Sequence, residues 1–170
     1  VTKNYDSFTL AADDWFQRKQ GTLRDVKKKL YLAMMNVNIL EGLRFYVSFA
    51  CTFSFAESKN MEGSAKIVSL VARDEATHLN LSTHVLKNWQ KGLDDKEMAK
   101  VAKDCEDEVY DMWRTCVDEE KAWANYLFKD GAIIGLNEEL LHHYVEFIAN
   151  KSLKALGLKT IYDRPLNNNP

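Results

Sequence analysis

The sequence predicts an all-α fold, a bundle of long helices, and three observations support this. The first 164 residues contain no proline, so the strongest helix breaker is missing from almost the whole chain. The seven glycines stand mostly where helices would end. The segments between them approach 30 residues, or about 45 Å of helix at 1.5 Å per residue. Helices of that length are typical of bundles that hold a cofactor between them.

The first long helix is predicted over residues 22–56, after an irregular or short helical segment at residues 1–21. Thr22 and Asp25 have the spacing of a capping pair at its start. Gly42 is its one weak point, at a cost of about 1 kcal/mol that packing can offset. Residues 45–55 are apolar on every side of the helix, which predicts a central, buried position.

Three further helices and an extended tail are predicted after the first. Caps and stops at Gly92, Asp94 or Asp95, Asn137 and Gly157 place these elements at residues 60–90, 96–129 and 138–156, with an Asn-rich tail at 159–170. We see no internal repeat and no linker. Residues 1–170 are therefore expected to form one helical domain, or half of one.

The composition excludes several classes of function. A formal net charge of −2 gives no reason to expect nucleic acid or an anionic membrane as a partner. The apolar stretch at 45–55 is about 11 residues long, too short for a helix that spans a bilayer. Cys51, Cys105 and Cys116 form no CxxC motif, and their odd number favours free thiols in a reducing cytosol.

Glu41 is the first candidate functional residue, because it directly precedes the most apolar part of its helix. A carboxylate in such surroundings needs a cation, a metal or a proton. Arg44, three residues on, offers an ordinary salt bridge. A metal is the alternative, and the residue alone does not decide between them.

Glu75 and His78 form a Glu-x-x-His motif, and this spacing projects both side chains from one helix face. In carboxylate-bridged di-metal bundles of the ferritin-like type, such a helix supplies one bridging carboxylate and one imidazole. Hard carboxylate oxygens and imidazole suit iron, and manganese equally well. The motif is weak by itself, but a Glu on a neighbouring buried helix strengthens it, and Glu41 meets that requirement.

A second Glu-x-x-His motif, Glu139 and His142, competes with the first. Together with Glu41, Glu75, His78 and one further acid it would complete a self-contained site. We do not favour this, because acids in the first turn of a helix are explained by the helix dipole. A site at a helix end would also lie far from ligands in the middle of other helices. His84 is expected on a different face, at the surface.

Several blocks of the sequence resemble the small subunit of class I ribonucleotide reductase, over roughly residues 24–165. The closest resemblance is to the branch found in enteric bacteria and their phages. The blocks occur in the same order and begin at residues 28 (KKLYL), 41 (EGLRFYVSFAC), 61 (MEGSAKI), 72 (ARDEATHL), 123 (WANYLF) and 135 (GLN).

The resemblance implies a role for seven residues. It makes Glu41, Glu75 and His78 ligands of one iron of a di-iron centre. It makes Asp74 an outer acid in the radical-transfer chain, consistent with the need for a carboxylate that fixes an imidazole. The remaining three residues would form the apolar pocket around a radical tyrosine, although ordinary core packing explains them equally well: Phe45, Phe49 and Val71.

The resemblance also implies what the chain lacks. The family's other three ligands, its radical tyrosine, the tryptophan that begins radical transfer and the tail that docks the large subunit have no counterpart here. We therefore expect the C-terminal half of a small subunit, split naturally or cut from a longer chain, and inactive alone. Its expected partners are the N-terminal half, a second small subunit and the large catalytic subunit, in a bacterial or phage-infected cytoplasm.

The assembled centre is expected to generate a tyrosyl radical for deoxyribonucleotide synthesis. Two other functions remain open at this point. One is a self-contained ferritin-like iron oxidase or storage protein that uses Glu139 and His142. The other is a metal-free helical scaffold. The ligands do not distinguish iron from manganese.

Overall fold

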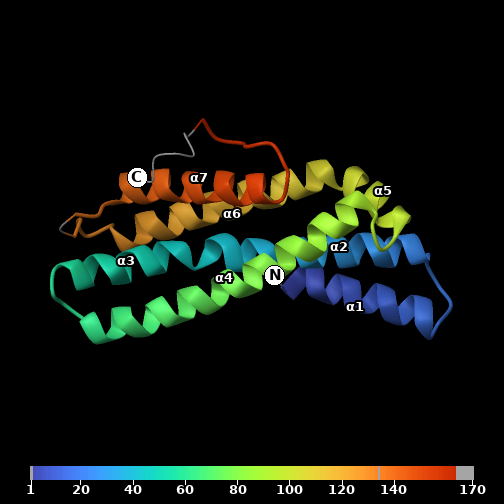
Figure 1. The fold of residues 1–170 in the computed structure, drawn as a ribbon, viewed down its shortest axis with the longest axis horizontal. Coiled ribbons are helices and arrows are strands. Elements are labelled where there is room, and N and C mark those ends of the chain that lie inside the picture. Colours follow the sequence, from blue (N-terminus) through green and yellow to red (C-terminus); the bar gives the residue numbers. More distant parts are fainter. Residues whose placement is uncertain (1, 134, 164–170) are drawn as a thin grey trace.

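A computed structural model describes residues 2–133 and 135–163, and it is an elongated helical bundle (Figure 1). The predicted all-α fold is confirmed: the described residues contain helices and one isolated bridge between Ile133 and Leu136, but no strand. The elements are α1 (Thr2–Phe16), α2 (Leu23–Ile39), η1 (Leu40–Arg44), α3 (Tyr46–Glu57), α4 (Glu62–Lys91), α5 (Lys96–Asp104), α6 (Glu106–Leu127) and α7 (Glu138–Ala155).

The predicted caps are present. Thr22 accepts a hydrogen bond from the Asp25 amide at 3.1 Å, and Asp95 and Asn137 cap α5 and α7 in the same way. Gly157 follows α7 with a φ of 78°, the left-handed conformation that favours glycine. Local sequence signals therefore determine the starts of α2, α5 and α7 and the end of α7, because each cap satisfies backbone groups that the helix leaves unpaired.

Two predicted helices are interrupted. The helix expected over 22–56 changes hydrogen-bonding pattern at η1, a single π-helical turn that contains Glu41. The helix expected over 96–129 breaks at Cys105 and ends at Leu127. The segment expected to be irregular or briefly helical, at 1–21, contains the 15-residue helix α1. Residues 159–163 have no helical structure, and the rest of the predicted tail lies outside the described residues.

The core runs along the bundle and draws on all the helices from α2 to α7. Tyr31 and Met35 of α2, Trp113 of α6 and Leu141 of α7 all belong to this one cluster of buried side chains, and all four are almost fully buried. All three thiols are free, as expected. Cys105 and Cys116 are buried in the same core, and Cys51 is half-buried. Burial raises the pKa of Cys116 to about 12, so this thiol stays protonated and unreactive.

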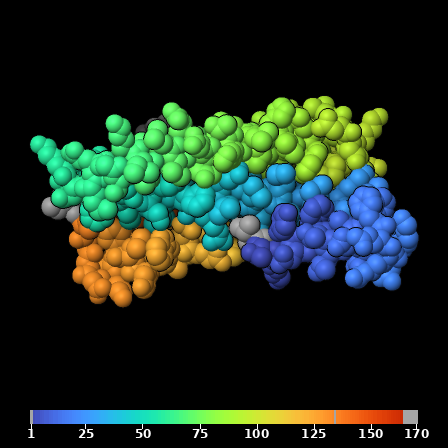
Figure 2. All heavy atoms as spheres, turned by 90° about the horizontal axis from the view of Figure 1, so that it is seen from below, coloured from blue at the N-terminus to red at the C-terminus, as the bar shows by residue number. Residues whose placement is uncertain are grey.

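The prediction of a buried second half for the first helix is wrong in this chain. Val47 is the only buried residue of α3, and Phe53 and Phe55 are more than a third exposed. Helix α4 runs along one edge of the molecule (Figure 2) and has exposed apolar side chains. These include Ile67, Leu70 and Val71. The sequence of α3 is apolar on all sides of the helix, but the rest of the described chain covers only part of the α3 surface.

The continuous helical run Leu23–Glu57 is long and apolar enough to cross a membrane by length and composition alone. The same profile is typical of the central helix of a bundle. Here the run contacts α4, α6 and α7, and it contains Glu41 and Arg44 near its middle. Only 22% of its most apolar window is buried among the described residues, so the bundle covers this apolar run only in part.

Candidate metal centre

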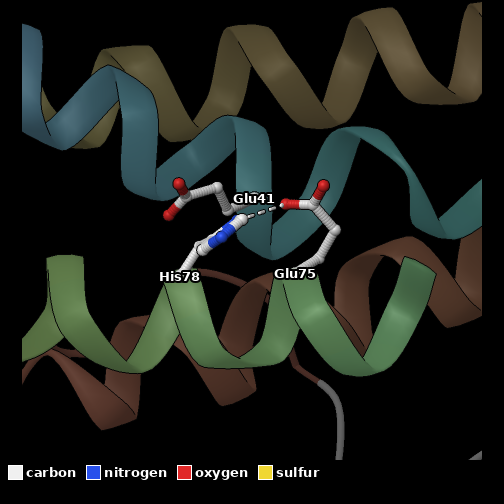
Figure 3. Close-up of side chains that lie close together, drawn as sticks. All are labelled: Glu41, Glu75 and His78. Carbon is white, nitrogen blue, oxygen red and sulfur yellow. Dashed lines mark hydrogen bonds and ion pairs between the residues drawn. The ribbon is translucent and has the colours of Figure 1, made fainter. Parts of the chain in front are cut away.

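Three predicted ligands come together where η1 faces α4. One ligand atom each from Glu41, Glu75 and His78 lies within 4.8 Å of the other two. Figure 3 shows Glu41 reaching from η1 toward the two side chains of α4. The His78 Nδ1 atom lies 3.4 Å from Glu75 Oε2. No other such group of three potential ligands occurs in residues 2–133 and 135–163.

The backbone places these side chains in two ways. On α4, the three-residue spacing puts Glu75 and His78 on one face. On the element that faces α4, Glu41 lies in η1, a single π-helical turn. Such turns often occur at functional sites. Gly42 allows the two elements to approach, because a Cβ atom there would lie 2.9 Å from Leu79 Cδ1.

The electrostatics of the cluster favour a cation. Glu41 is half-buried, and burial raises the pKa of its carboxyl above the usual value. The Ser82 hydrogen bond and His78 oppose this rise, whereas the neighbouring Glu75 adds to it. The two carboxylates repel one another when both are ionised, and a divalent cation bound between them relieves that repulsion. The donor set suits iron or manganese.

The salt bridge considered for Glu41 does not form. Arg44 pairs with Glu119 of α6 and lies 3.9 Å from Glu120. Glu41 instead accepts a hydrogen bond from Ser82 Oγ at 3.0 Å. Sequence analysis did not single out Ser82, although its position four residues after His78 was a usable signal, since that spacing returns to the same helix face.

The cluster is open on one side. The side chain of His78 is 58% exposed and that of Glu75 is 21% exposed, so the potential ligands meet at the surface of this chain. Three ligands leave a metal ion short of the coordination it needs. The geometry therefore matches part of a metal centre that other groups would complete.

The other predicted residues surround this cluster unevenly. Phe45 and Phe49 stack with their ring centroids 5.9 Å apart, but Val71 is 43% exposed, so no closed apolar pocket forms. The side chain of Asp74 is 69% exposed and lies 3.9 Å from Arg73. Nothing in the described residues assigns Asp74 a role.

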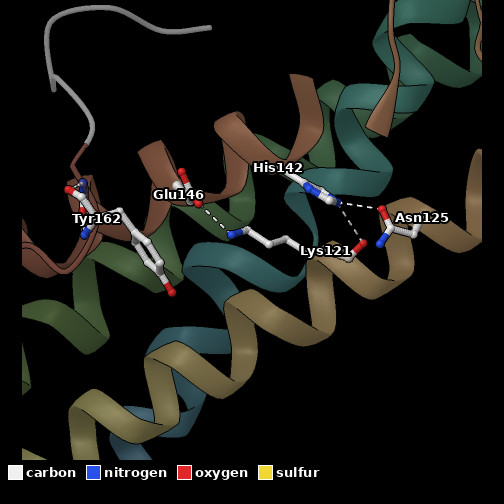
Figure 4. A network of polar contacts seen from close by, with 6 residues as sticks. Lys121, Asn125, His142, Glu146 and Tyr162 are labelled. Atoms are coloured by element: carbon white, nitrogen blue, oxygen red, sulfur yellow. Dashed lines mark hydrogen bonds and ion pairs between the residues drawn. The ribbon is translucent and has the colours of Figure 1, made fainter. Parts of the chain in front are cut away.

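The second Glu-x-x-His motif is not part of the cluster. His142 Nε2 lies 2.8 Å from Asn125 Oδ1 and 3.3 Å from the Lys121 carbonyl oxygen, both on α6 (Figure 4). A protonated Nε2 would donate to both of these acceptors, and the two contacts hold the imidazole ring against α6. One turn later, Glu146 accepts from Lys121 at 2.7 Å. This network joins α6 to α7. His84 is exposed on α4, as expected.

The fold and the cluster define a ferritin-like helical bundle with a carboxylate–histidine cluster that could hold a metal. Comparison with known proteins gives the family: residues 9–170 match the profile of "Ribonucleotide reductase, small chain". The chain therefore belongs to the family of ribonucleotide reductase small chains, which are components of an oxidoreductase.

Two relatives and one solved structure illustrate the similarity. The chain is 55% identical over 137 residues to ribonucleoside-diphosphate reductase subunit beta of Haemophilus influenzae, covering 81% of this chain and 36% of the relative. It is 47% identical over 169 residues to ribonucleoside-diphosphate reductase 1 subunit beta of Escherichia coli O157:H7, covering 93% and 45%. The R2 subunit of Clostridium botulinum superimposes with a TM-score of 0.71 at 26% identity, covering 99% and 50%. The chain thus spans half the length of these proteins or less.

Proposed function

We propose that this chain contributes half of a di-metal centre to the small subunit of a class I ribonucleotide reductase. Glu41, Glu75 and His78 are the proposed ligands, and iron or manganese is the proposed metal. The observation that carries the proposal is the convergence of these three side chains, from two elements, in a member of the family. The donor chemistry and the open side of the cluster support it.

The residues of this chain have separate tasks in the proposed centre. Glu41 and Glu75 supply negative charge that compensates the metal ions, and His78 supplies a neutral donor. Phe45, Phe49 and Val71 keep water away once a partner covers them. With dioxygen as the oxidant, a bound metal pair would supply the chemistry that oxidises a tyrosine of the other half to a radical. Asp74 is proposed to act in radical transfer, from the exposed face of α4.

The missing ligands are proposed to come from the N-terminal half of a small subunit, on a separate chain or on a continuation of this one. The exposed apolar side chains of α3 and α4 support this, because large exposed apolar patches mark interaction surfaces. The complete small subunit would form a homodimer and serve a large catalytic subunit in the cytoplasm. This chain alone would be inactive.

Co-purification tests the proposed assembly. The chain is captured through a small affinity tag from the cells that produce it, and the accompanying protein is identified by mass spectrometry. We expect a protein segment with a second Glu-x-x-His motif and a tyrosine, together with bound iron or manganese and a tyrosyl radical signal in electron paramagnetic resonance. The mass of the mature chain shows whether the other half is separate or continuous.

A matched pair of variants controls this experiment. Glu75→Ala with His78→Ala should remove the metal and the radical, whereas Glu139→Ala with His142→Ala should leave both. A monodisperse 19.6 kDa chain that carries a full load of metal alone would overturn the proposal. Loss of metal from the second pair of variants would favour the self-contained oxidase or storage protein instead.

A further inference from the structure

A chain of buried polar side chains lies directly behind Glu41. Ser82 Oγ donates to Glu41 Oε2 at 3.0 Å, and Asn38 Nδ2 donates to Ser82 Oγ at 2.9 Å. Asn38 is fully buried and Ser82 is 4% exposed. Asn38 lies one turn before Glu41, and Ser82 lies one turn after His78. This series of hydrogen bonds therefore connects α4 with the helical run of α2 and η1, the two segments that carry the cluster.

The direction of these hydrogen bonds is determined by the groups themselves. An amide nitrogen only donates, so the Ser82 oxygen must accept from Asn38. The hydroxyl hydrogen of Ser82 is then left for an acceptor, and two are in reach: Glu41 Oε2 at 3.0 Å and the Leu79 carbonyl oxygen at 3.2 Å. A carboxylate is the stronger acceptor, because hydrogen bonds to ionised groups are stronger than those to neutral ones. The hydroxyl therefore points to Glu41.

Within the part of the chain that the structure describes, the side-chain amide of Asn38 pairs its nitrogen but not its oxygen. Its amide nitrogen also donates to Thr83 Oγ1 at 2.9 Å, so both of its hydrogens point to α4. Its Oδ1 atom has no hydrogen-bond partner among the described residues. Such a buried orphan is costly, and an apolar side chain would avoid that cost. Asn38 thus occupies a position that packing alone does not explain.

We propose that Ser82 is a positioning residue for the Glu41 ligand, with Asn38 directing the Ser82 hydroxyl toward it. The hydrogen bond holds Glu41 Oε2 and leaves Oε1 for the metal. Glu41 needs such a partner because it is the one proposed ligand on η1, whereas Glu75 and His78 contact each other at 3.4 Å on one face of α4. Groups that hold a metal ligand in this way commonly affect affinity by roughly 10–100-fold. The inference rests on the proposed metal site.

Cobalt titration of the metal-free assembly of this chain with its co-purifying other half tests it, because Co²⁺ has visible d–d bands that report coordination geometry. We expect Ser82→Ala to weaken Co²⁺ binding by about 10-fold and to change the d–d spectrum. Ser82→Thr keeps the hydroxyl and should restore both. Asn38→Ala should shift affinity and spectrum in the same direction, but less, because the hydroxyl remains.

Two controls separate positioning from general damage. Ser69→Ala also deletes a hydroxyl from α4, one that donates to the Lys66 carbonyl at 2.7 Å, and it should change neither quantity. Circular dichroism of the metal-free variants establishes that each is folded. If Ser82→Ala does not fold, Asn38→Ala carries the test, and wild-type affinity and spectrum in that variant would overturn the inference.

The failures of the two proposals are distinguishable. If Glu41→Ala binds Co²⁺ as the wild type does, the proposed metal site is wrong and the inference is wrong with it. If Glu41→Ala loses binding but Ser82→Ala keeps the wild-type affinity and spectrum, only the positioning role is wrong. A spectrum that Ser82→Thr does not restore also argues against the hydroxyl as the cause.

Discussion

Two Glu-x-x-His motifs in this chain have the same spacing and different surroundings. Glu75 and His78 lie within the 30-residue helix α4 and face a third potential ligand, Glu41. Glu139 and His142 lie in the first turns of α7, where His142 contacts Asn125 and the Lys121 carbonyl on α6. Spacing places two side chains on one face of a helix. The neighbouring element decides whether that face becomes a metal site or a helix contact.

The comparison also shows what each motif has around it. His142 has polar contacts to Asn125 and Lys121 of α6 and Glu139 is exposed, so no third ligand from the described residues joins that motif. Glu75 and His78 instead face a second carboxylate, Glu41, from another element. Several potential ligands gathered at one point are a better sign of a metal site than spacing is, because like charges held together lower stability unless something binds between them.

The strongest test of this contrast is removal of the two α4 ligands. Glu75→Ala with His78→Ala should weaken Co²⁺ binding by more than about 100-fold, beyond the loss typical of outer groups. Glu139→Ala with His142→Ala should leave the affinity within about twofold, a difference too small to reflect a lost ligand. Isothermal titration calorimetry measures both. Equal losses in the two pairs would remove the distinction drawn between the motifs.

Glu120 is a buried carboxylate outside the metal cluster, and burial should keep its carboxyl protonated to a higher pH than that of an exposed acid. Burial raises its pKa to about 7, Arg44 opposes the rise and Glu119 adds to it. The folded protein therefore binds this proton more tightly than the unfolded chain does. The stabilisation is fully present below the unfolded value of 4.5 and is lost as the pH rises to about 7.

Urea denaturation at pH 4.5 and pH 8 measures this effect. The free energy of unfolding should fall between them by on the order of 3 kcal/mol through Glu120. Glu120→Gln resembles the protonated acid and should remove that part of the fall. The same pH dependence in the variant would show that Glu120 is ionised in the folded protein throughout.

His142 and His78 should also differ, by a smaller amount, in how much each contributes to the free energy of unfolding. His142→Ala removes the hydrogen bonds to α6 and should lower the free energy of unfolding by about 1 kcal/mol. His78→Ala, measured without metal, should cost less, because its side chain is exposed and contacts Glu75 only at 3.4 Å. Thermal melting of both variants decides this. A larger loss for His78 would mean that the first motif is also a structural contact.

The smallest expected effect concerns the acids of the two motifs. Glu139 lies in the first turn of α7, where a negative charge interacts favourably with the helix dipole. Glu139→Gln should therefore destabilise the chain by about 0.3 kcal/mol. Glu75→Gln in the metal-free chain should be neutral or slightly stabilising, because it removes repulsion with Glu41. Denaturation at low ionic strength compares them, and the difference should shrink in high salt.

Much of the fold could be predicted from local patterns. Thr22, Asp95 and Asn137 cap helices as expected, because a cap involves only a few neighbouring residues. The π-helical turn at Glu41 and the break at Cys105 were not predicted. Each depends on how a helix packs against its neighbours. Gly42 marked a weak point within the π-helical turn but did not predict its form, and no proline or glycine lies beside Cys105.

The candidate site was predicted in part. Glu41, Glu75 and His78 were identified, and the structure brings them together. Ser82 and Asn38 were not, because a serine and an asparagine on two helices become partners only when the helices pack. The burial expected for residues 45–55 was wrong, since an apolar pattern says that a surface avoids water but not which chain covers it.

The sequence by itself determined that the chain is helical, where α2, α5 and α7 begin, and which side chains have the chemistry of a metal site. It also favoured Glu75 and His78 over the second Glu-x-x-His motif. Only the tertiary structure brought Glu41 to those two residues, moved Arg44 from Glu41 to α6, and gave Glu41 its partner on α4. The last two outcomes depend on residues that lie 41 or 75 positions apart, and packing alone brings such residues together.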